Sequence, residues 1–83
     1  MDYQRLRGAL GNTIRAERYR RGYRSQEAFA YAAGVHPNYM GAVERGERNV
    51  SLQNLLRIAG ALDMPLSRLL AAAEELAASE SSP

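Results

Sequence analysis

The chain has 83 residues, a formal net charge of +2, 46% hydrophobic and 24% charged residues, and no cysteine. This length provides for a single small domain, and the composition is that of a folded globular protein rather than a disordered chain. The lack of cysteine excludes disulfides, thiolate zinc sites and cysteine nucleophiles. No run of about 18 apolar residues is present, so we expect neither a membrane span nor a signal peptide.

The basic charge is concentrated at the beginning of the chain. Residues 1–24 hold seven arginines against two acidic residues, whereas residues 63–83 hold one arginine against four acidic residues. All eleven basic residues are arginine, which suits bidentate phosphate contacts and equally fits a coding preference for arginine codons. This uneven charge predicts a polyanionic partner.

The first half of the chain predicts three helices. The first runs from residue 3 to about residue 21, because apolar side chains recur at three- and four-residue spacing: Tyr3, Leu6, Leu10 and Ile14. Gly22 ends it, and the N-cap residue Ser25 begins a short helix over 26–33 that ends at Gly34. Pro37 fits the first turn of a third helix, about 37–45, that ends at Gly46.

Two further helices are predicted in the second half. Ser51 caps a helix over about 52–62, with an apolar stripe of Leu52, Leu55, Leu56, Ala59 and Leu62. The segment Asp63-Met64-Pro65 breaks this helix, and a fifth follows from residue 66 to about residue 78. Residues 79–83 are polar, and we expect a disordered tail there. No segment has strand periodicity, so the sequence predicts one all-α domain over residues 1–78.

The second and third helices form a candidate helix-turn-helix unit over about residues 25–45. A short turn containing Gly34 joins them, Ala30 is small where they must approach closely, and Val35 is an apolar plug in the turn. Met40 and Val43 face inward. The outward face then carries mostly small or hydrogen-bonding side chains, which suit a major groove about 12 Å wide: His36, Asn38, Tyr39, Gly41, Ala42 and Arg45.

Many positions in fixed register resemble the Cro/CI-type helix-turn-helix family, also called the xenobiotic-response-element family. The resemblance covers about residues 10–71, and the matching residues are Ser25-Gln26-Glu27, Ala30, Gly34-Val35, Tyr39, Val43-Glu44-Arg45-Gly46, Arg48-Asn49, Ser51-Leu52, Leu55-Leu56, Ala59 and Leu62. The run from Glu44 to Asn49 followed by Ser51-Leu52 is similar to short stand-alone regulators such as restriction-modification controller proteins. The segment from Ile14 to Gln26 is one residue longer than the common family pattern.

The resemblance implies a five-helix, lambda-repressor-like fold that binds DNA as a homodimer, with the third helix reading bases. It also implies a structural ion pair between a first-helix arginine and the glutamate that ends the third helix. Here that pair is Arg18 and Glu44.

Three residues are candidates for base readout. The amide of Asn38 has the geometry for paired hydrogen bonds to adenine, with a phosphate or water contact as the alternative. His36 is a candidate for a DNA contact or for an exposed helix cap, and Ala42 can contact only shape or a thymine methyl group. Candidates for contacts to the DNA backbone are Arg24, Gln26, Tyr39, Arg45, Arg48 and Asn49. Alternatives are a solvated Gln26, core packing of Tyr39 and a surface pair between an arginine and Glu47.

The fifth helix carries an apolar stripe wider than one thin core can cover. We therefore expect its outer part to meet a second subunit about a two-fold axis, through Met64, Leu66, Leu69, Leu70 and Ala73. Two recognition helices would then lie about one DNA turn (~34 Å) apart, and the operator would be a near-palindrome.

The function that follows is a sequence-specific transcriptional regulator in the cytoplasm of a bacterium or phage-infected cell, associated with the nucleoid. We expect partners to be double-stranded DNA, a second copy of the chain and, as a further candidate, RNA polymerase; we expect no enzyme activity, cofactor or metal. Two alternatives remain open. One is an antitoxin or prophage repressor, and the other is a helix-turn-helix-derived module that binds protein.

Overall fold

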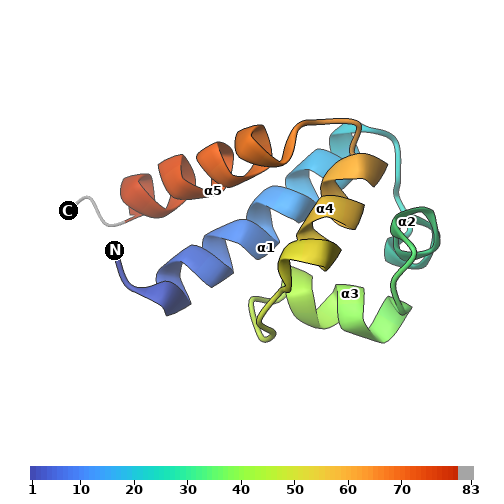
Figure 1. Ribbon diagram of the computed structural model, residues 1–83, viewed down its shortest axis with the longest axis horizontal. Coiled ribbons are helices and arrows are strands. Elements are labelled where there is room, and N and C mark those ends of the chain that lie inside the picture. Colours follow the sequence, from blue (N-terminus) through green and yellow to red (C-terminus); the bar gives the residue numbers. More distant parts are fainter. Residues whose placement is uncertain (81–83) are drawn as a thin grey trace.

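The computed structural model describes residues 1–80 as five α-helices and no strand, which confirms the expected all-α fold (Figure 1). The helices are α1 (Tyr3–Arg20), α2 (Gln26–Ala33), α3 (Pro37–Glu44), α4 (Leu52–Ala61) and α5 (Leu66–Glu80). Within this described part, no helix combines the length and apolar character that crossing a bilayer requires. Their bounds agree with the expected ranges to within one or two residues.

The helix ends follow the predicted signals. The side chain of Ser25 accepts a hydrogen bond from the backbone N–H of Ala28 at 3.2 Å, and that of Ser51 accepts one from the N–H of Asn54 at 3.1 Å. These are N-caps, which satisfy donors that the first helical turn leaves unpaired. Left-handed backbone follows the helix ends at Gly22, Gly34, Gly46 and Asp63. Three of these four positions are therefore glycines, for which such a conformation carries no steric cost.

Every helix contributes a large side chain to one core. α1 and α5 lie side by side along the molecule, while α4 lies across them and α2 and α3 are at the far end from the chain termini (Figure 1). Fully buried residues from the five helices meet between them: Ile14, Phe29, Met40, Ile58 and Leu69. The core therefore fixes α3 indirectly, through the helices behind it.

Two of the predicted interface residues are corrected by this packing. Leu69 and Ala73 are both 0% exposed within a single chain, because α5 turns this side of its apolar stripe toward α1. They belong to the core and offer no surface to a second subunit. The other three predicted interface residues, Met64, Leu66 and Leu70, are only half-buried.

The apolar stripe of α4 also differs from the expectation. Leu52 and Leu56 are 71% and 63% exposed, although the periodicity placed them with the core residues Ala59 and Leu62. Both lie at the edge of a stripe that is wider than the core it faces. Two large aliphatic side chains are consequently left on the surface.

The last helix is longer than predicted. It continues through Ser79 to Glu80, so the predicted disordered tail is wrong for these two residues, neither of which is a strong helix breaker. The remainder of that predicted tail, residues 81–83, lies outside the described residues.

Candidate nucleic-acid interface

The turn between α2 and α3 has the geometry that the sequence predicted. Gly34 takes a left-handed conformation with φ of 75°, and the N–H of Val35 donates to the carbonyl of Ala30 at 3.0 Å. Ala30 is fully buried and Val35 is half-buried. The compact turn sets α3 at an angle to α2 and leaves one side of α3 in solvent.

A buried carboxylate connects α3 to both preceding helices. The side chain of Glu44 is 0% exposed, and its Oε2 accepts a hydrogen bond from Nε of Arg18 at 2.7 Å. Its Oε1 accepts one from Nε2 of Gln26 at 2.9 Å, and Nε of Arg15 lies 3.7 Å away. The expected ion pair between Arg18 and Glu44 is therefore present, as part of a network that orients α3.

Arg18 carries more of this arrangement than its pair with Glu44. Its Nη1 donates to the carbonyls of Tyr23 and Arg24, at 2.9 and 3.2 Å, and so holds the segment that leads into α2. Burial lowers the pKa of Arg18, but the hydrogen bond and charge of Glu44 and the contact with Tyr19 together raise this pKa above its ordinary value. The guanidinium remains charged.

Two glycines permit the close approach of α3 to its neighbours. A Cβ on Gly11 of α1 would lie 2.6 Å from the carbonyl oxygen of Glu44, and a Cβ on Gly41 of α3 would lie 2.9 Å from Oε1 of Gln26. Larger residues would push α3 away from α1 or α2. Sequence reasoning placed Gly41 on the outward face, whereas the structure buries it.

The outward side of α3 displays the residues predicted to read bases. His36 and Asn38 are exposed, and Ala42 is half-buried. Nδ1 of His36 accepts a hydrogen bond from the backbone N–H of Asn38 at 3.0 Å, so this histidine is the N-cap of α3. The side-chain amide of Asn38 has no hydrogen bond within residues 1–80 and is free for a ligand.

The predicted backbone-contact residues fall into two groups. Arg24 has no intramolecular partner within the described chain, Arg45 pairs with exposed Glu47 at 3.1 Å, and the guanidinium of Arg48 lies 5.4 Å from the ring centre of half-buried Tyr39. These groups lie at the surface, and neither contact removes a guanidinium from solvent. Both arginines remain able to turn toward a phosphate.

The other group is already occupied by contacts within the chain. Gln26 uses its amide NH₂ on Glu44, and Oδ1 of Asn49 accepts hydrogen bonds from the hydroxyl of Tyr3 at 2.8 Å and from Nη1 of Arg7 at 3.0 Å. A contact from Asn49 to DNA is left to its NH₂ group, and one from Gln26 to its backbone N–H. Sequence reasoning missed the link to α1, because no periodic pattern connects residues more than forty positions apart.

Much of the positive charge near the N-terminus is neutralised inside the molecule. Glu17 pairs with Arg20 at 2.8 Å and with Arg21 at 2.9 Å, and Nε of Arg21 donates to the carbonyl of Leu62 at the end of α4. The charge count of residues 1–24 therefore overstates the number of arginines available to a polyanion. No group of three or more potential metal ligands occurs among the residues that the structure describes.

Comparisons with known proteins agree with this geometry. The helix-turn-helix domain family matches residues 9–73. The control protein C.SmaI of Serratia marcescens is 48% identical over 46 residues, which are 55% of each chain, so the match spans about half the length of that relative.

Two solved structures have a similar fold at substantial identity. The restriction-modification controller protein C.AhdI of Aeromonas hydrophila is 44% identical with a TM-score of 0.71, over 75% of this chain and 92% of that one. The clp gene regulator ClgR of Corynebacterium glutamicum is 32% identical with a TM-score of 0.85, over 92% and 80% of the two chains. These relatives are described as control or regulator proteins and not as enzymes, in agreement with the expectation from the sequence.

Proposed function

The chain belongs to the helix-turn-helix domain family, and from that premise we propose that it regulates transcription as a homodimer bound to a near-palindromic operator in double-stranded DNA. The observation that carries the proposal is the outward face of α3, where Asn38 has an uncommitted amide while Glu44 at the far end of the helix is locked to α1 and α2. Such a helix presents hydrogen-bonding side chains on a rigid support, which readout of base edges requires.

In this proposal α3 enters the major groove. The amide of Asn38 makes paired hydrogen bonds to adenine, the small side chain of Ala42 admits a thymine methyl group, and His36 contacts a base edge while it caps the helix. Small and polar groups on this face allow the helix to enter the groove deeply. Base contacts of this kind determine which sequence is bound.

The contacts to the DNA backbone come from the two ends of the helix-turn-helix unit. The N-terminus of α2, with the backbone N–H of Gln26, binds one phosphate, and Arg24 lies just before it. Arg45, Arg48 and Asn49 follow α3, and Tyr39 supports Arg48 from below. Each phosphate neutralised adds about −0.9 to the slope of log affinity against log salt concentration on duplex DNA.

Apolar surface supports the dimeric form. Met64, Leu66 and Leu70 stay half-buried within the single chain, and exposed Leu52 and Leu56 lie on neighbouring α4. Small domains have thin cores, and a contiguous apolar face on one of them marks a contact surface. A two-fold arrangement would place two copies of α3 about one DNA turn (~34 Å) apart.

Similarity to control proteins of restriction-modification systems favours a role in setting the expression of such a system or of another operon. The dimer would block or recruit RNA polymerase at a promoter that overlaps its operator. This role places the protein in the bacterial cytoplasm, bound to DNA.

The test is selection of bound sequences from a random duplex library at near-physiological salt. We expect the wild-type protein to enrich a near-palindrome and Asn38→Ala to relax one position in each half-site. Gln53→Ala, at an exposed position on α4, is the matched control and should enrich the wild-type motif. Absence of enrichment by the wild-type protein would refute sequence-specific DNA binding and favour a protein-binding module.

A further inference from the structure

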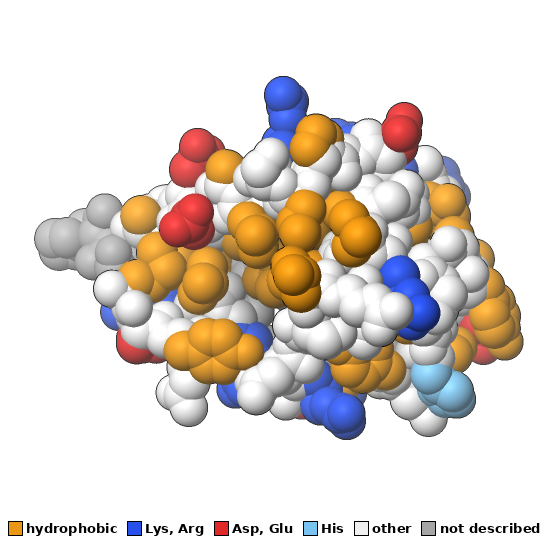
Figure 2. Space-filling view, viewed as in Figure 1, with side chains coloured by type: hydrophobic (Ala, Val, Ile, Leu, Met, Phe, Trp, Pro, Cys, Tyr) orange, Lys and Arg blue, Asp and Glu red, His pale blue; other side chains and the backbone are white. Residues whose placement is uncertain are grey.

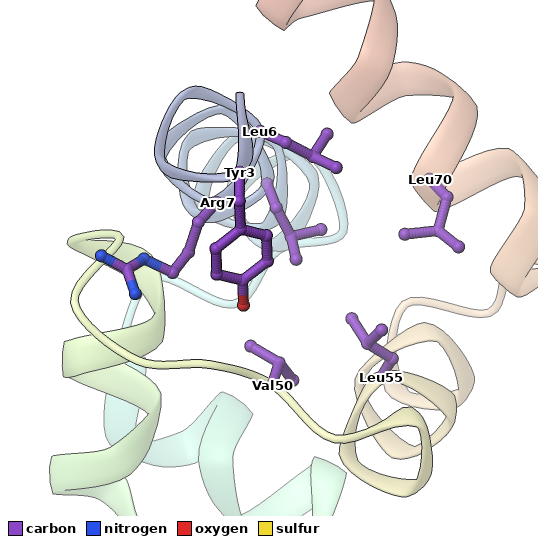
Figure 3. Close-up of a pocket in the computed structure, with 7 residues that line it drawn as sticks. Tyr3, Leu6, Arg7, Val50, Leu55 and Leu70 are labelled. Carbon is purple, nitrogen blue, oxygen red and sulfur yellow. The ribbon is translucent and has the colours of Figure 1, made fainter. Parts of the chain in front are cut away.

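A small apolar cavity lies between the first turns of α1, the segment before α4, α4 itself and α5. Its volume is about 120 Å³, and apolar side chains form most of its wall: Leu6, Leu10, Val50, Leu55 and Leu70. Tyr3 and Arg7 complete the rim (Figure 3). In Figure 3 the ring of Tyr3 points down from α1 toward Val50, while Leu55 and Leu70 face the same hollow from the other side.

Next to this cavity stands a ridge formed by Leu52 and Leu56. These two leucines lie one helical turn apart on α4, 71% and 63% exposed, and Leu55 between them in sequence lines the cavity. Figure 2 shows hydrophobic side chains gathered where the beginning of α4 approaches α5, with charged groups mostly around the edge of this face. A protruding apolar ridge and an apolar hollow therefore share one face of the molecule.

We propose that this face is where the second copy docks, with the Leu52–Leu56 ridge of each subunit packed into the cavity of the other. The proposal rests on the homodimer proposed above and assigns its contact surface. An interface about a two-fold axis must be self-complementary, because each contact occurs twice with the roles exchanged. A ridge and a hollow side by side meet this requirement, whereas two ridges or two hollows do not.

The size of the hollow fits a leucine. Apolar cavities of roughly 150 Å³ stay dry and accept a group as large as benzene, so a hollow of about 120 Å³ accepts one aliphatic side chain. Filling it would also shield the two exposed leucines from water. Their burial provides the central apolar anchors that dominate the energetics of most protein interfaces.

The same cavity is linked to the candidate DNA-contact segment. Tyr3 and Arg7 form its rim, and both donate hydrogen bonds to Oδ1 of Asn49, which directly follows Arg48. A leucine from a second copy that packs against Tyr3 would restrict the ring and thereby hold Asn49 in place. Dimerisation therefore orders the segment that carries Arg45 and Arg48, and couples subunit docking to phosphate binding.

The first experiment measures the dimer dissociation constant by sedimentation equilibrium for the wild-type protein, Leu56→Glu and Leu52→Glu. Both substitutions place a carboxylate on an exposed site, so the monomer should remain folded. We expect each to weaken the dimer at least about tenfold. Tyr31→Glu is the matched control, because Tyr31 is an equally exposed apolar residue, at 69%, on α2 and away from the cavity; its dimer should be unchanged.

The outcomes separate this inference from the proposed function. A wild-type dimer that persists in both leucine variants would overturn the docking surface and leave the homodimer intact. A wild-type protein that is monomeric at all concentrations, alone and on its operator, would refute the homodimer itself. Equal weakening by Tyr31→Glu would also overturn the assignment, because the effect would not be specific to the ridge.

A second experiment tests the coupling through Tyr3. The substitution Tyr3→Phe keeps the ring at the cavity and removes the hydroxyl that bonds to Asn49. We expect an unchanged dimer dissociation constant and an affinity for the operator lowered by about two- to tenfold, the range for loss of one hydrogen bond. Unchanged operator affinity at an unchanged dimer constant would overturn the coupling.

Discussion

Gly11 of α1 lies directly against the carbonyl oxygen of Val43 in α3, so that a Cβ at position 11 would stand 2.5 Å from this oxygen. Backbone atoms cannot move aside as a flexible side chain can. Replacing Gly11 by Ala should therefore force α1 and α3 apart and lower the free energy of unfolding by about 1–3 kcal/mol or more, the range for overpacking in a core. Urea denaturation measures this change.

Gly8 provides the control on the same helix. A Cβ at Gly8 would meet nothing within 4 Å, and alanine is a better helix former than glycine by about 0.5–1 kcal/mol. Gly8→Ala should consequently raise the free energy of unfolding, whereas Gly11→Ala lowers it. Two shifts of the same sign would show that the close approach of α1 to α3 does not determine stability.

The buried network around Glu44 predicts a large loss of stability when its charge is removed. Glu44→Gln would leave the guanidinium of Arg18, whose side chain is 6% exposed, without a counter-charge. Breaking a buried pair on one side costs about 3–5 kcal/mol. Glu47→Gln, which breaks only the exposed pair with Arg45, should cost less than about 1 kcal/mol. Comparable losses in the two variants would contradict a structural role for Glu44.

The pKa of Arg18 is raised in the folded protein, and this fixes the direction of its contribution to pH-dependent stability. A raised pKa of a basic group stabilises the fold at every pH below the pKa of the unfolded chain, and this contribution is lost only as the pH rises through the folded value. For arginine that range is strongly alkaline. Titration of Arg18 should thus cause no change in unfolding free energy between pH 5 and about pH 9, as urea titrations at several pH values can check.

Two substitutions separate the two functions of His36. Its Nδ1 caps α3, so His36→Ala should destabilise the fold by about 0.5–2 kcal/mol. His36→Ser restores a capping oxygen and should recover that stability in thermal unfolding. If His36 contacts a base, the serine variant still loses operator affinity despite its restored fold, whereas wild-type affinity in the serine variant would limit His36 to capping.

Salt dependence tests the backbone contact proposed for Arg48. Removing one phosphate contact with Arg48→Gln should make the slope of log affinity against log salt shallower by about 0.9 and weaken binding equally on all sequences. Arg57→Gln is the control, because Arg57 lies on α4 and bonds to Asn54. Fluorescence anisotropy at several salt concentrations gives both slopes, and an unaltered slope for Arg48→Gln would exclude this contact.

The elements of the fold were predictable because their signals are local. Ser25 and Ser51 cap helices where their sequence position indicated, and Gly34 takes the left-handed turn on which the helix-turn-helix geometry depends. The ion pair of Arg18 with Glu44 came from the family resemblance rather than from spacing. It is present at 2.7 Å.

What the sequence did not indicate depends on contacts between distant segments. Periodicity shows that α4 and α5 have wide apolar stripes, but it does not show which edge the core covers, so exposed Leu56 and buried Leu69 were interchanged in role. The link from Tyr3 to Asn49 was missed for the same reason. Polar side chains at the surface have no periodic pattern that marks their partners.

The packing of α5 along the whole of α1 joins the two ends of the folded chain. During synthesis α1 leaves the ribosome first, yet the helix that covers its apolar side is made last. The early chain must therefore wait with Leu10 and Ile14 incompletely covered, and nascent protein without α5 is a natural substrate for chaperones and proteases. Cells would thus accumulate the DNA-binding surface only from completed chains, and a premature stop before residue 66 should leave no stable fragment that competes for the operator.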